Sequence, residues 1–491
     1  MSDRLSALDV SFLYLESRTT PMHVGGVLIF EPPSSGFDHD RLVALIRSRI
    51  AFVPRYRQRV RWVPGNLSNP VWVDDETFDV AYHVRRSALP RPGTDAQLRE
   101  LVARIMSRQL DLKRPLWEMY LVEGLEGGRF ALLTKTHHAM VDGVSAVDIG
   151  QVILDASPEV KPATATAWRP AREPTGLELV VGAVSDALRS PGVAFDTLRG
   201  GVDELRVVAA RAGHQAAGVL NAALTVVRPP SSSPLNVEIG SARRFATATT
   251  SLADFKAIRT AHGGTVNDVV LAVVTGALRE WLQSRGDSLT SRSTVRALVP
   301  VSLRSDSHEV GGNRVAAYLV DLPVGEPNPV LRLQRISFEM GQHKAGGQMM
   351  GAQALVSLAG FSPPTLHSLG ARVGNGLSRK VFNTAVTNVP GPQFPLYAGG
   401  AHLVAAYPVV PLSLGQAVSF GVTSYDGGVY FGLNADRDAM YDVDELADHL
   451  LDSLDALRAT VRVRRRSTKS TKSTKAANSA KATRARESTA T

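Results

Sequence analysis

Two proline-rich segments place the strongest constraint on the fold, because no long helix or central strand runs through them. The segment "SPEVKPATATAWRPAREP" covers residues 157–174, and "RPPSSSPLN" covers residues 228–236. Proline lacks a backbone N–H and clashes with the preceding helical turn. The chain has 491 residues, more than one ordinary hydrophobic core holds. We therefore predict domains at residues 1–157 and 237–461, joined by a linker at 158–236.

Strand and helix patterns alternate in both predicted domains. In the first, strand-like residues 24–32 and 127–138 accompany helical apolar spacing over 40–49 and 98–110. The second has helix patterns over 263–286, where Thr265 and Asp268 form a capping-box pair, and over 442–461. Its strand patterns are "RRFATATTSL", "VRALVPVSLR", "NRVAAYLVDLP", "AVTNVPGP", "AVSFGVTSY" and "GVYFGLNAD". This alternation predicts an α/β fold with two related layered domains.

The linker carries its own helical pattern. Residues 176–227 have Val, Leu and Ala at helical spacing and only Pro191 as an internal proline. We predict one or two amphipathic helices there. They are either a structural crossover, a cover over an apolar site or a helix that lies on a membrane surface.

The formal net charge of +9 belongs to one end of the chain. Residues 462–491 hold ten of the 55 Lys and Arg and one of the 46 Asp and Glu, so residues 1–461 carry 45 of each. The segment repeats Ser-Thr-Lys and has no aromatic residue, which predicts a disordered basic tail. It either improves solubility or attaches to anionic lipid or nucleic acid.

Several classes of protein are excluded by composition. The chain has no cysteine, which rules out disulfides, thiolate nucleophiles and cysteine-bound zinc. Its N-terminus lacks a basic start followed by an apolar run, and no run of about 18 apolar residues occurs, so we expect no secretory signal and no membrane span. With 44% apolar and 21% charged residues, a soluble cytoplasmic protein is expected, with peripheral contact to a membrane or lipid droplet as an option.

The segment "KTHHAMVDGVSA" places two histidines at the end of a predicted strand. Successive strand side chains point to opposite faces, so His137 and His138 cannot serve one atom together. Gly143 predicts a tight turn before a helix. A neutral imidazole suits proton abstraction from a hydroxyl. No G-x-S-x-G elbow is present, and histidines that point apart suit no metal site, so we expect a base that activates direct attack by a substrate hydroxyl.

The spacing to Asp142 leaves two registers open. His137 and Asp142 form His-x4-Asp, the signature of glycerolphosphate acyltransferases, whereas His138 and Asp142 form His-x3-Asp, that of two-domain CoA-dependent acyltransferases. Both classes transfer acyl groups. Gly143 directly after the aspartate and the two predicted soluble domains favour the second register and His138.

Sequence blocks in a fixed order extend this pattern from Leu5 to Leu457. They include "LSALDVSFLYLE", "TPMHVGG", "RPLWEMYLVEGL", "KTHHAMVDGVSA", "VNDVVLAVV", "VPVSLR", "TNVPGP" and "SYDGGVYFGLNAD". In these blocks the chain resembles the bacterial wax ester synthase/diacylglycerol acyltransferase family. The basic tail lies outside the resemblance.

The resemblance implies a chloramphenicol acetyltransferase-like fold, in which two mixed-sheet domains meet at a tunnel. It implies a long-chain acyl-CoA and either diacylglycerol or a long-chain alcohol as substrates, with triacylglycerol or wax ester and free CoA as products. Acyl-CoA is a substrate, so no cofactor is implied, and nucleic acid is not expected as a partner. Two alternatives stay open: a non-catalytic protein that binds lipid surfaces, and an acyltransferase with another alcohol or an amine as acceptor.

The resemblance also implies roles for the residues of the motif. His138 would be the general base on the acceptor hydroxyl, and His137 would support the site. Asp142 would turn away from the substrate and pair with an arginine, for which Arg304 is our candidate. Gly143 would permit the turn.

Three further residues are candidate substrate-binding groups. Asn267 would steady an oxyanion, or is only a polar residue of a helical first turn. Asn388 would donate a hydrogen bond in the tunnel, or only forms a turn before Pro390. His23 would line the tunnel, or is packed in the interior. Trp117, in the Pro-Leu-Trp element of "RPLWEMYLVEGL", is expected in the core.

Overall fold

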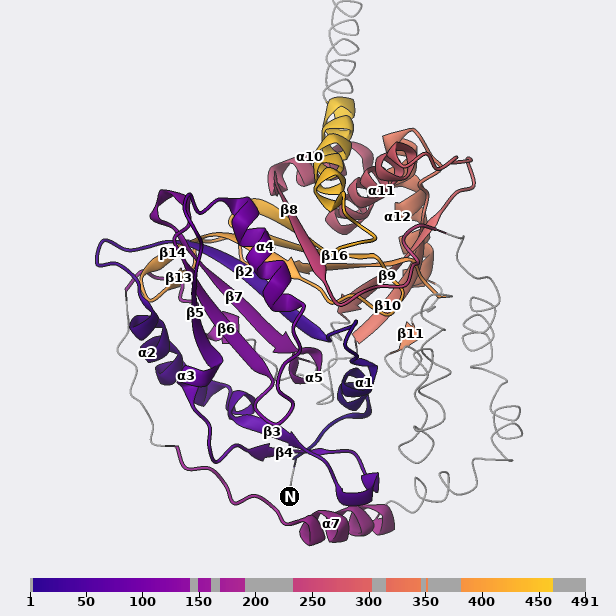
Figure 1. Ribbon diagram of the computed structural model, residues 1–491. Coiled ribbons are helices and arrows are strands. Elements are labelled where there is room, and N and C mark those ends of the chain that lie inside the picture. Colours follow the sequence, from indigo (N-terminus) through magenta and orange to yellow (C-terminus); the bar gives the residue numbers. More distant parts are fainter. Residues whose placement is uncertain are drawn as a thin grey trace, which may run out of the picture.

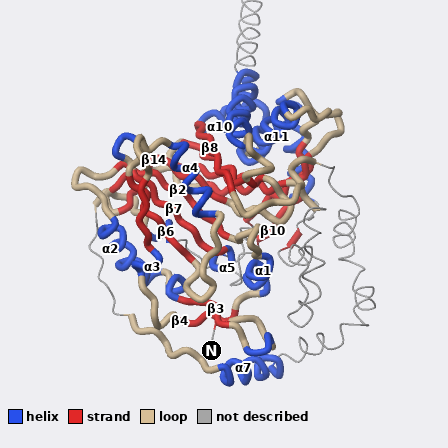
Figure 2. The backbone as a smooth tube through the Cα atoms, in the orientation of Figure 1, coloured by secondary structure: helices blue, strands red, loops and turns tan. Residues whose placement is uncertain are grey.

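The computed structural model describes residues 3–141, 149–159, 168–189, 233–302, 315–345, 350–351 and 381–461. Two large twisted sheets lie next to each other, with helices on their outer sides (Figures 1 and 2). Both sheets contain parallel and antiparallel strand pairs. The predicted α/β architecture of two mixed-sheet domains is thus confirmed.

The first sheet has six strands. Its order is β13 (Tyr397–Ala398), β14 (Ala401–Val409), β2 (His23–Glu31), β7 (Phe130–His137), β6 (Trp117–Glu123) and β5 (Val84–Ala88). Every residue of β7, a central strand, is buried, because helices cover the sheet on both faces. Val27 and Ile29 of β2 pack on one side against α4 (Asp95–Met106), and Phe30 packs on the other side with α2 (His39–Arg49).

The second sheet has seven strands. Its order is β11 (Met350–Gly351), β10 (Val315–Leu322), β9 (Val295–Ser302), β12 (Thr384–Pro390), β15 (Val418–Tyr425), β16 (Gly428–Asp436) and β8 (Arg243–Ser251). Its helices are α10 (Leu252–His262), α11 (Val266–Ser284), α12 (Pro329–Ala345) and a helix over residues 443–461. The predicted capping box at Thr265 and Asp268 begins α11.

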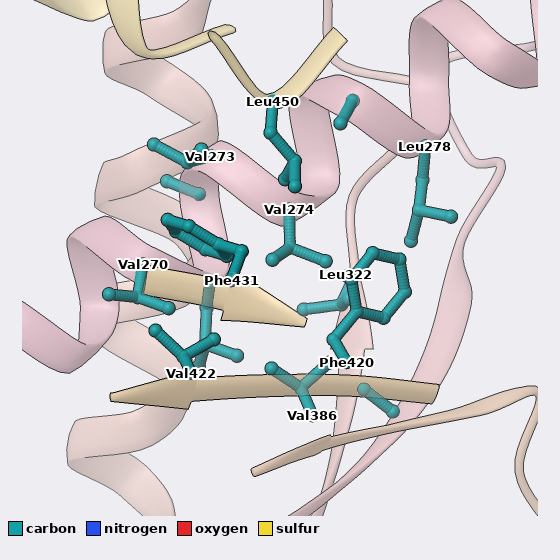
Figure 3. Packing of buried hydrophobic residues seen from close by; sticks show 14 of the residues in the cluster. Val270, Val273, Val274, Leu278, Leu322, Val386, Phe420, Val422, Phe431 and Leu450 are labelled. Atoms are coloured by element: carbon teal, nitrogen blue, oxygen red, sulfur yellow. The ribbon is translucent and has the colours of Figure 1, made fainter. Parts of the chain in front are cut away.

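The core of the second domain explains why α11 is so apolar. Side chains of Val270, Val274 and Leu278 point into a cluster with residues of β12, β15 and β16 (Figure 3). Leu450 of the 443–461 helix closes the cluster from the other side. A helix buried between a sheet and another helix needs apolar residues on most of its circumference.

Smaller elements complete the described part of the chain. A three-stranded sheet has the order β1 (Asp3–Arg4), β4 (Val71–Asp74), β3 (Gln58–Arg61). The remaining elements are α1 (Ala7–Leu15), α3 (Val80–His83), α5 (His138–Val141), α6 (Ile149–Val152), α7 (Gly176–Arg189), η1 (Ile50–Phe52), η2 (Pro54–Arg57), η3 (Pro64–Asn66) and η4 (Glu126–Gly128). Of the predicted linker helices, α7 is described, and the rest of residues 176–227 lies outside the described residues.

One segment joins the two sheets. Strands β13 and β14 follow the predicted domain boundary by more than 150 residues of chain, yet β14 pairs with β2 in the first sheet, from His402 with Glu31 to Val409 with Gly25. At the junction, a Cβ on Gly432 of β16 would lie 2.0 Å from the backbone oxygen of Pro408. Only glycine allows this close approach of β14 to the second sheet.

Candidate active site

The two histidines lie where β7 ends and α5 begins. His137 is the last strand residue, and its N–H donates to the carbonyl of Leu116 at 2.9 Å. His138 is the first residue of α5, and its N–H donates to the carbonyl of Met22 at 2.8 Å. The predicted strand over 127–138 is therefore corrected to Phe130–His137. A strand-like residue pattern does not mark where a strand turns into a helix, and tertiary hydrogen bonds set that point here.

His137 is fully buried and faces two different groups. Its Nδ1 accepts a hydrogen bond from the N–H of Ala139 at 3.1 Å. Its Nε2 lies 3.5 Å from Oε2 of Glu16. Since a neutral imidazole carries one proton, acceptance at Nδ1 places that proton on Nε2, toward the carboxylate.

Glu16 forms the C-cap of α1 and lies between two imidazoles. Its Oε1 is 3.3 Å from Nε2 of His23. His23 on β2 is the residue that pairs with His137 on β7. Burial would raise the pKa of Glu16, but its close contacts with the imidazoles of His137 and His23 outweigh burial and lower the pKa to about 2. Burial lowers the pKa of His23 to about 4. At neutral pH the cluster is a buried carboxylate beside a neutral imidazole.

His138 has different surroundings from His137. Its ring stacks on Phe12 of α1 with ring centroids 4.0 Å apart. Protein atoms are densely packed around the side chain, but part of its surface is still exposed to solvent. Burial lowers the pKa of His138 to about 4, against a smaller raising effect of its own backbone carbonyl. The ring is therefore a neutral base at pH 7. Its Nδ1 is buried, which leaves Nε2 as the nitrogen that can face a substrate.

The second domain reaches the loop beside these residues. Arg243, at the start of β8, donates a hydrogen bond to the carbonyl of Thr19. Thr19 lies between α1 and β2, three residues after Glu16. The histidine pair is thus close to the contact between the two domains. A small cavity between α4 and β8 has none of the candidate site residues in its lining, which includes Val27, Leu98, Val102, Phe245, Thr247 and Tyr407.

The two candidate asparagines of the second domain lie together. Asn267 is in the first turn of α11, and Asn388 is on β12. Nδ2 of Asn388 donates to Oδ1 of Asn267 at 3.0 Å, and both side chains are partly exposed. This hydrogen bond fixes the orientation of the Asn267 side chain. It uses the Oδ1 atom of Asn267, so the Nδ2 hydrogens of Asn267 point away from Asn388.

The remaining candidates divide into two groups. Asp142, Gly143 and Arg304 lie outside the described residues, so the Asp142–Arg304 pair stays a prediction. Trp117 is in the core, as predicted, where its Nε1–H donates to the carbonyl of Tyr56 at 2.8 Å. His23 is buried beside Glu16 and His137.

Sequence reasoning did not single out Glu16 or Phe12. Both lie in the block "LSALDVSFLYLE", more than 120 residues before the histidines they contact. An acidic residue four positions after an aromatic one is common on helices, so no local signal marks either residue.

Comparisons with known proteins identify the family. A wax ester synthase/diacylglycerol acyltransferase catalytic domain matches residues 5–270, and the C-terminal domain of the same family matches residues 311–458. The probable diacylglycerol O-acyltransferase tgs2 of Mycobacterium tuberculosis is 38% identical over 477 residues, covering 94% of this chain and 100% of that protein. The related tgs1 is 34% identical over 472 residues, covering 94% of this chain and 97% of that protein.

Solved structures agree. The wax ester synthase/diacylglycerol acyltransferase from Marinobacter aquaeolei VT8 matches with a TM-score of 0.66 and 29% identity, covering 93% of this chain and 99% of that one. The starter condensation domain of rhizomide synthetase matches with a TM-score of 0.55 and 14% identity, covering 94% of each chain, and shares the fold alone. The chain therefore belongs to the wax ester synthase/diacylglycerol acyltransferase family and is an acyltransferase.

Proposed function

We propose that the protein transfers a long-chain acyl group from acyl-CoA to the hydroxyl of diacylglycerol, and also to long-chain alcohols. The observation that carries this proposal is the neutral, partly exposed imidazole of His138 at the start of α5. Family membership supports the acyl-CoA donor, and the names of tgs2 and tgs1 support diacylglycerol as the acceptor. The products are triacylglycerol or wax ester and free CoA.

The proposed reaction has no acyl-enzyme. Nε2 of His138 accepts the proton of the acceptor hydroxyl as its oxygen attacks the thioester carbonyl. The tetrahedral oxyanion collapses, the carbon–sulfur bond breaks, and the CoA thiolate receives the proton from the imidazolium. Asp142 would hold the loop by pairing with Arg304, and Gly143 would permit its turn. Both substrates would meet in a tunnel between the domains, near the contact of Arg243 with Thr19.

The asparagine pair is the proposed source of oxyanion stabilisation. Asn388 orients Asn267 through their side-chain hydrogen bond, so the Nδ2 group of Asn267 can donate elsewhere. A donor oriented before the reaction stabilises developing negative charge without reorganisation during the step.

An acceptor panel tests the proposed function. We expect the purified protein to release CoA from palmitoyl-CoA when diolein or hexadecanol is added, with formation of the corresponding ester, and to release little without an acceptor. CoA release should be measured together with the lipid product. Release with an amine only would assign another acceptor. Binding to lipid vesicles without any thiol release would indicate a non-catalytic lipid-binding protein.

We further propose that the protein works in the cytoplasm as a peripheral protein at a membrane or lipid-droplet surface. None of the helices in the described ranges is long and apolar enough to cross a membrane. The net charge of +9 on residues 462–491 suits attraction to anionic headgroups. Leu177 and Val181 of α7 support surface contact, since they are 74% and 59% exposed on the side opposite to buried Leu179 and Ala183.

Removal of residues 462–491 is expected to weaken binding to phosphatidylglycerol-rich liposomes by at least about tenfold, because each basic residue near such a surface contributes about 1 kcal/mol. Turnover in detergent should be unchanged, since the tail lies outside the family's matched residues. Liposome sedimentation at low and high salt measures the effect. Equal binding of both forms at low salt would remove the proposed role of the tail.

A further inference from the structure

We propose that Glu16 is a positioning residue, whose carboxylate holds His137 in the tautomer that fixes the start of α5 and thereby the ring of His138. The inference rests on the proposed function for its consequence in turnover. It concerns a contact between the N-terminal segment and the end of β7.

The geometry places one carboxylate at the end of a short chain of contacts. Oε2 of Glu16 lies 3.5 Å from Nε2 of His137, and Nδ1 of the same ring accepts from the N–H of Ala139 at 3.1 Å. The other oxygen, Oε1, lies 3.3 Å from Nε2 of His23. Glu16 thus contacts the two imidazoles that face each other across β2 and β7.

The carboxylate of Glu16 is buried in the interior of the protein. Its side chain is only 4% exposed, and His137 is completely buried. An ionised carboxylate in the interior destabilises the fold unless its partners offset the lost hydration. The lowered pKa of Glu16 shows that His137 and His23 offset this cost, so the carboxylate is held between the two imidazoles in its ionised form.

The tautomer connects the charge to the backbone. The N–H of Ala139 is one of the first N–H groups of α5, which have no partner inside the helix. His137 satisfies it only when Nδ1 carries no proton, because a protonated nitrogen cannot accept. The negative charge of Glu16 at Nε2 favours the tautomer with the proton on Nε2, and this leaves Nδ1 free to accept.

His138 is the residue between these two anchored positions. Its backbone follows His137 and precedes Ala139, and its own N–H is bound to Met22. Helix α1, which ends at Glu16, also supplies Phe12, on which the His138 ring stacks. The orientation of the proposed base therefore depends on α1 at two points.

Glu16→Leu and Glu16→Gln test the inference in the full-length protein. Glu16→Leu should lower kcat by about 100-fold, the size of effect that a misplaced reacting group produces, with KM for palmitoyl-CoA little changed. Glu16→Gln keeps an oxygen that can accept from Nε2–H, so it should recover much of kcat. A kcat of Glu16→Leu within about twofold of wild type would overturn the inference.

Glu118→Leu is the matched control for Glu16→Leu. Glu118 lies on β6 in the same sheet, is also largely buried, and its Oε2 lies 3.6 Å from Nζ of Lys135. The same loss of charge there should leave kcat near the wild-type value once thermal unfolding shows that the variant is folded. An equal loss of kcat in both variants would indicate a general effect of buried charge and would overturn the specific role of Glu16.

A second measurement does not need turnover. In protein with 15N-labelled histidine, long-range 1H–15N spectra distinguish protonated from unprotonated ring nitrogens, and His137→Gln assigns the signals. The wild type should show His137 protonated at Nε2 alone, and Glu16→Leu should show a mixture of tautomers. An unchanged tautomer would overturn the inference. If the wild type transfers no acyl group at all, the proposed function fails, but this spectrum still decides the role of Glu16. If Glu16→Leu does not fold, Glu16→Met, which also lacks a carboxylate oxygen, replaces it in both measurements.

Discussion

Replacement of His138 by alanine is expected to lower CoA release from palmitoyl-CoA and diolein by about 100- to 10,000-fold, the usual contribution of a positioned acid–base group. The reason is that the variant has no imidazole at the partly exposed start of α5 that could accept the proton of the hydroxyl. The measurement is thiol release together with triacylglycerol formation, at a protein concentration high enough to detect a residual rate.

His137→Ala is the comparison for this prediction. It removes the cap on Ala139 and one partner of Glu16, so it should lower turnover less than His138→Ala and stability more. Circular dichroism and thermal unfolding separate the two effects. Equal losses of turnover from both variants, with unchanged folding, would contradict the choice of His138 as the base.

Trp117→Ala is expected to lower the free energy of unfolding by about 3–5 kcal/mol, the cost of truncating a large aromatic residue in a core. Trp117 is 1% exposed, and its ring stacks on His83 with centroids 4.7 Å apart. Its Nε1–H also donates to Tyr56, so truncation leaves that buried carbonyl without this donor. Urea unfolding of both proteins measures the difference.

Trp62→Ala is the matched control, because Trp62 is 38% exposed and touches Tyr14 only edge-on. It should cost no more than about 1 kcal/mol. A loss below about 1 kcal/mol for Trp117→Ala would contradict its place in the core. Loss of turnover at full stability would instead give Trp117 a part in the site.

The layered architecture could be predicted because each element has a local pattern. Short runs rich in apolar, aromatic or β-branched residues predicted β2, β8 and β16, and the nearly continuous apolar surface of α11 predicted a buried helix. These patterns follow from which faces of an element are covered. They depend on residues a few positions apart, so one sequence is enough to read them.

The pairing of β14 with β2 could not be predicted in the same way. An apolar strand pattern shows that a strand is covered, but it does not identify the strand that pairs with it. In this chain β2 ends at Glu31 and β14 begins at Ala401, so the rest of the first domain, the linker and most of the second domain lie between the two strands. The helices α10 and α12 were also missed, because their buried stripes alternate with polar residues and give a weak signal.

The candidate site depends on both local and distant contacts. The spacing of His138 and Asp142 is local and pointed to acyl transfer, whereas the contact of His137 with Glu16 joins residues from the two ends of the first domain. The end of β7 at His137 depends on hydrogen bonds to Leu116 and Met22, which lie on other segments. Such contacts exist only after the chain has folded.

The pH dependence of kcat/KM tests the central claim most directly, because it reports the protonation of the essential base in the free enzyme. The base acts in its neutral form, and burial lowers the pKa of His138 from 6.5 to about 4. The free energy of unfolding should itself fall as the pH drops from about 6.5 to 4, since His23 and His138 bind protons more tightly in the unfolded chain than in the folded protein. Circular dichroism must therefore confirm at each pH that the protein is folded. We predict a constant kcat/KM for triacylglycerol formation from pH 8 down to about pH 5. An acid inflection between pH 6 and 7 in fully folded protein would contradict a neutral His138 with a lowered pKa as the base.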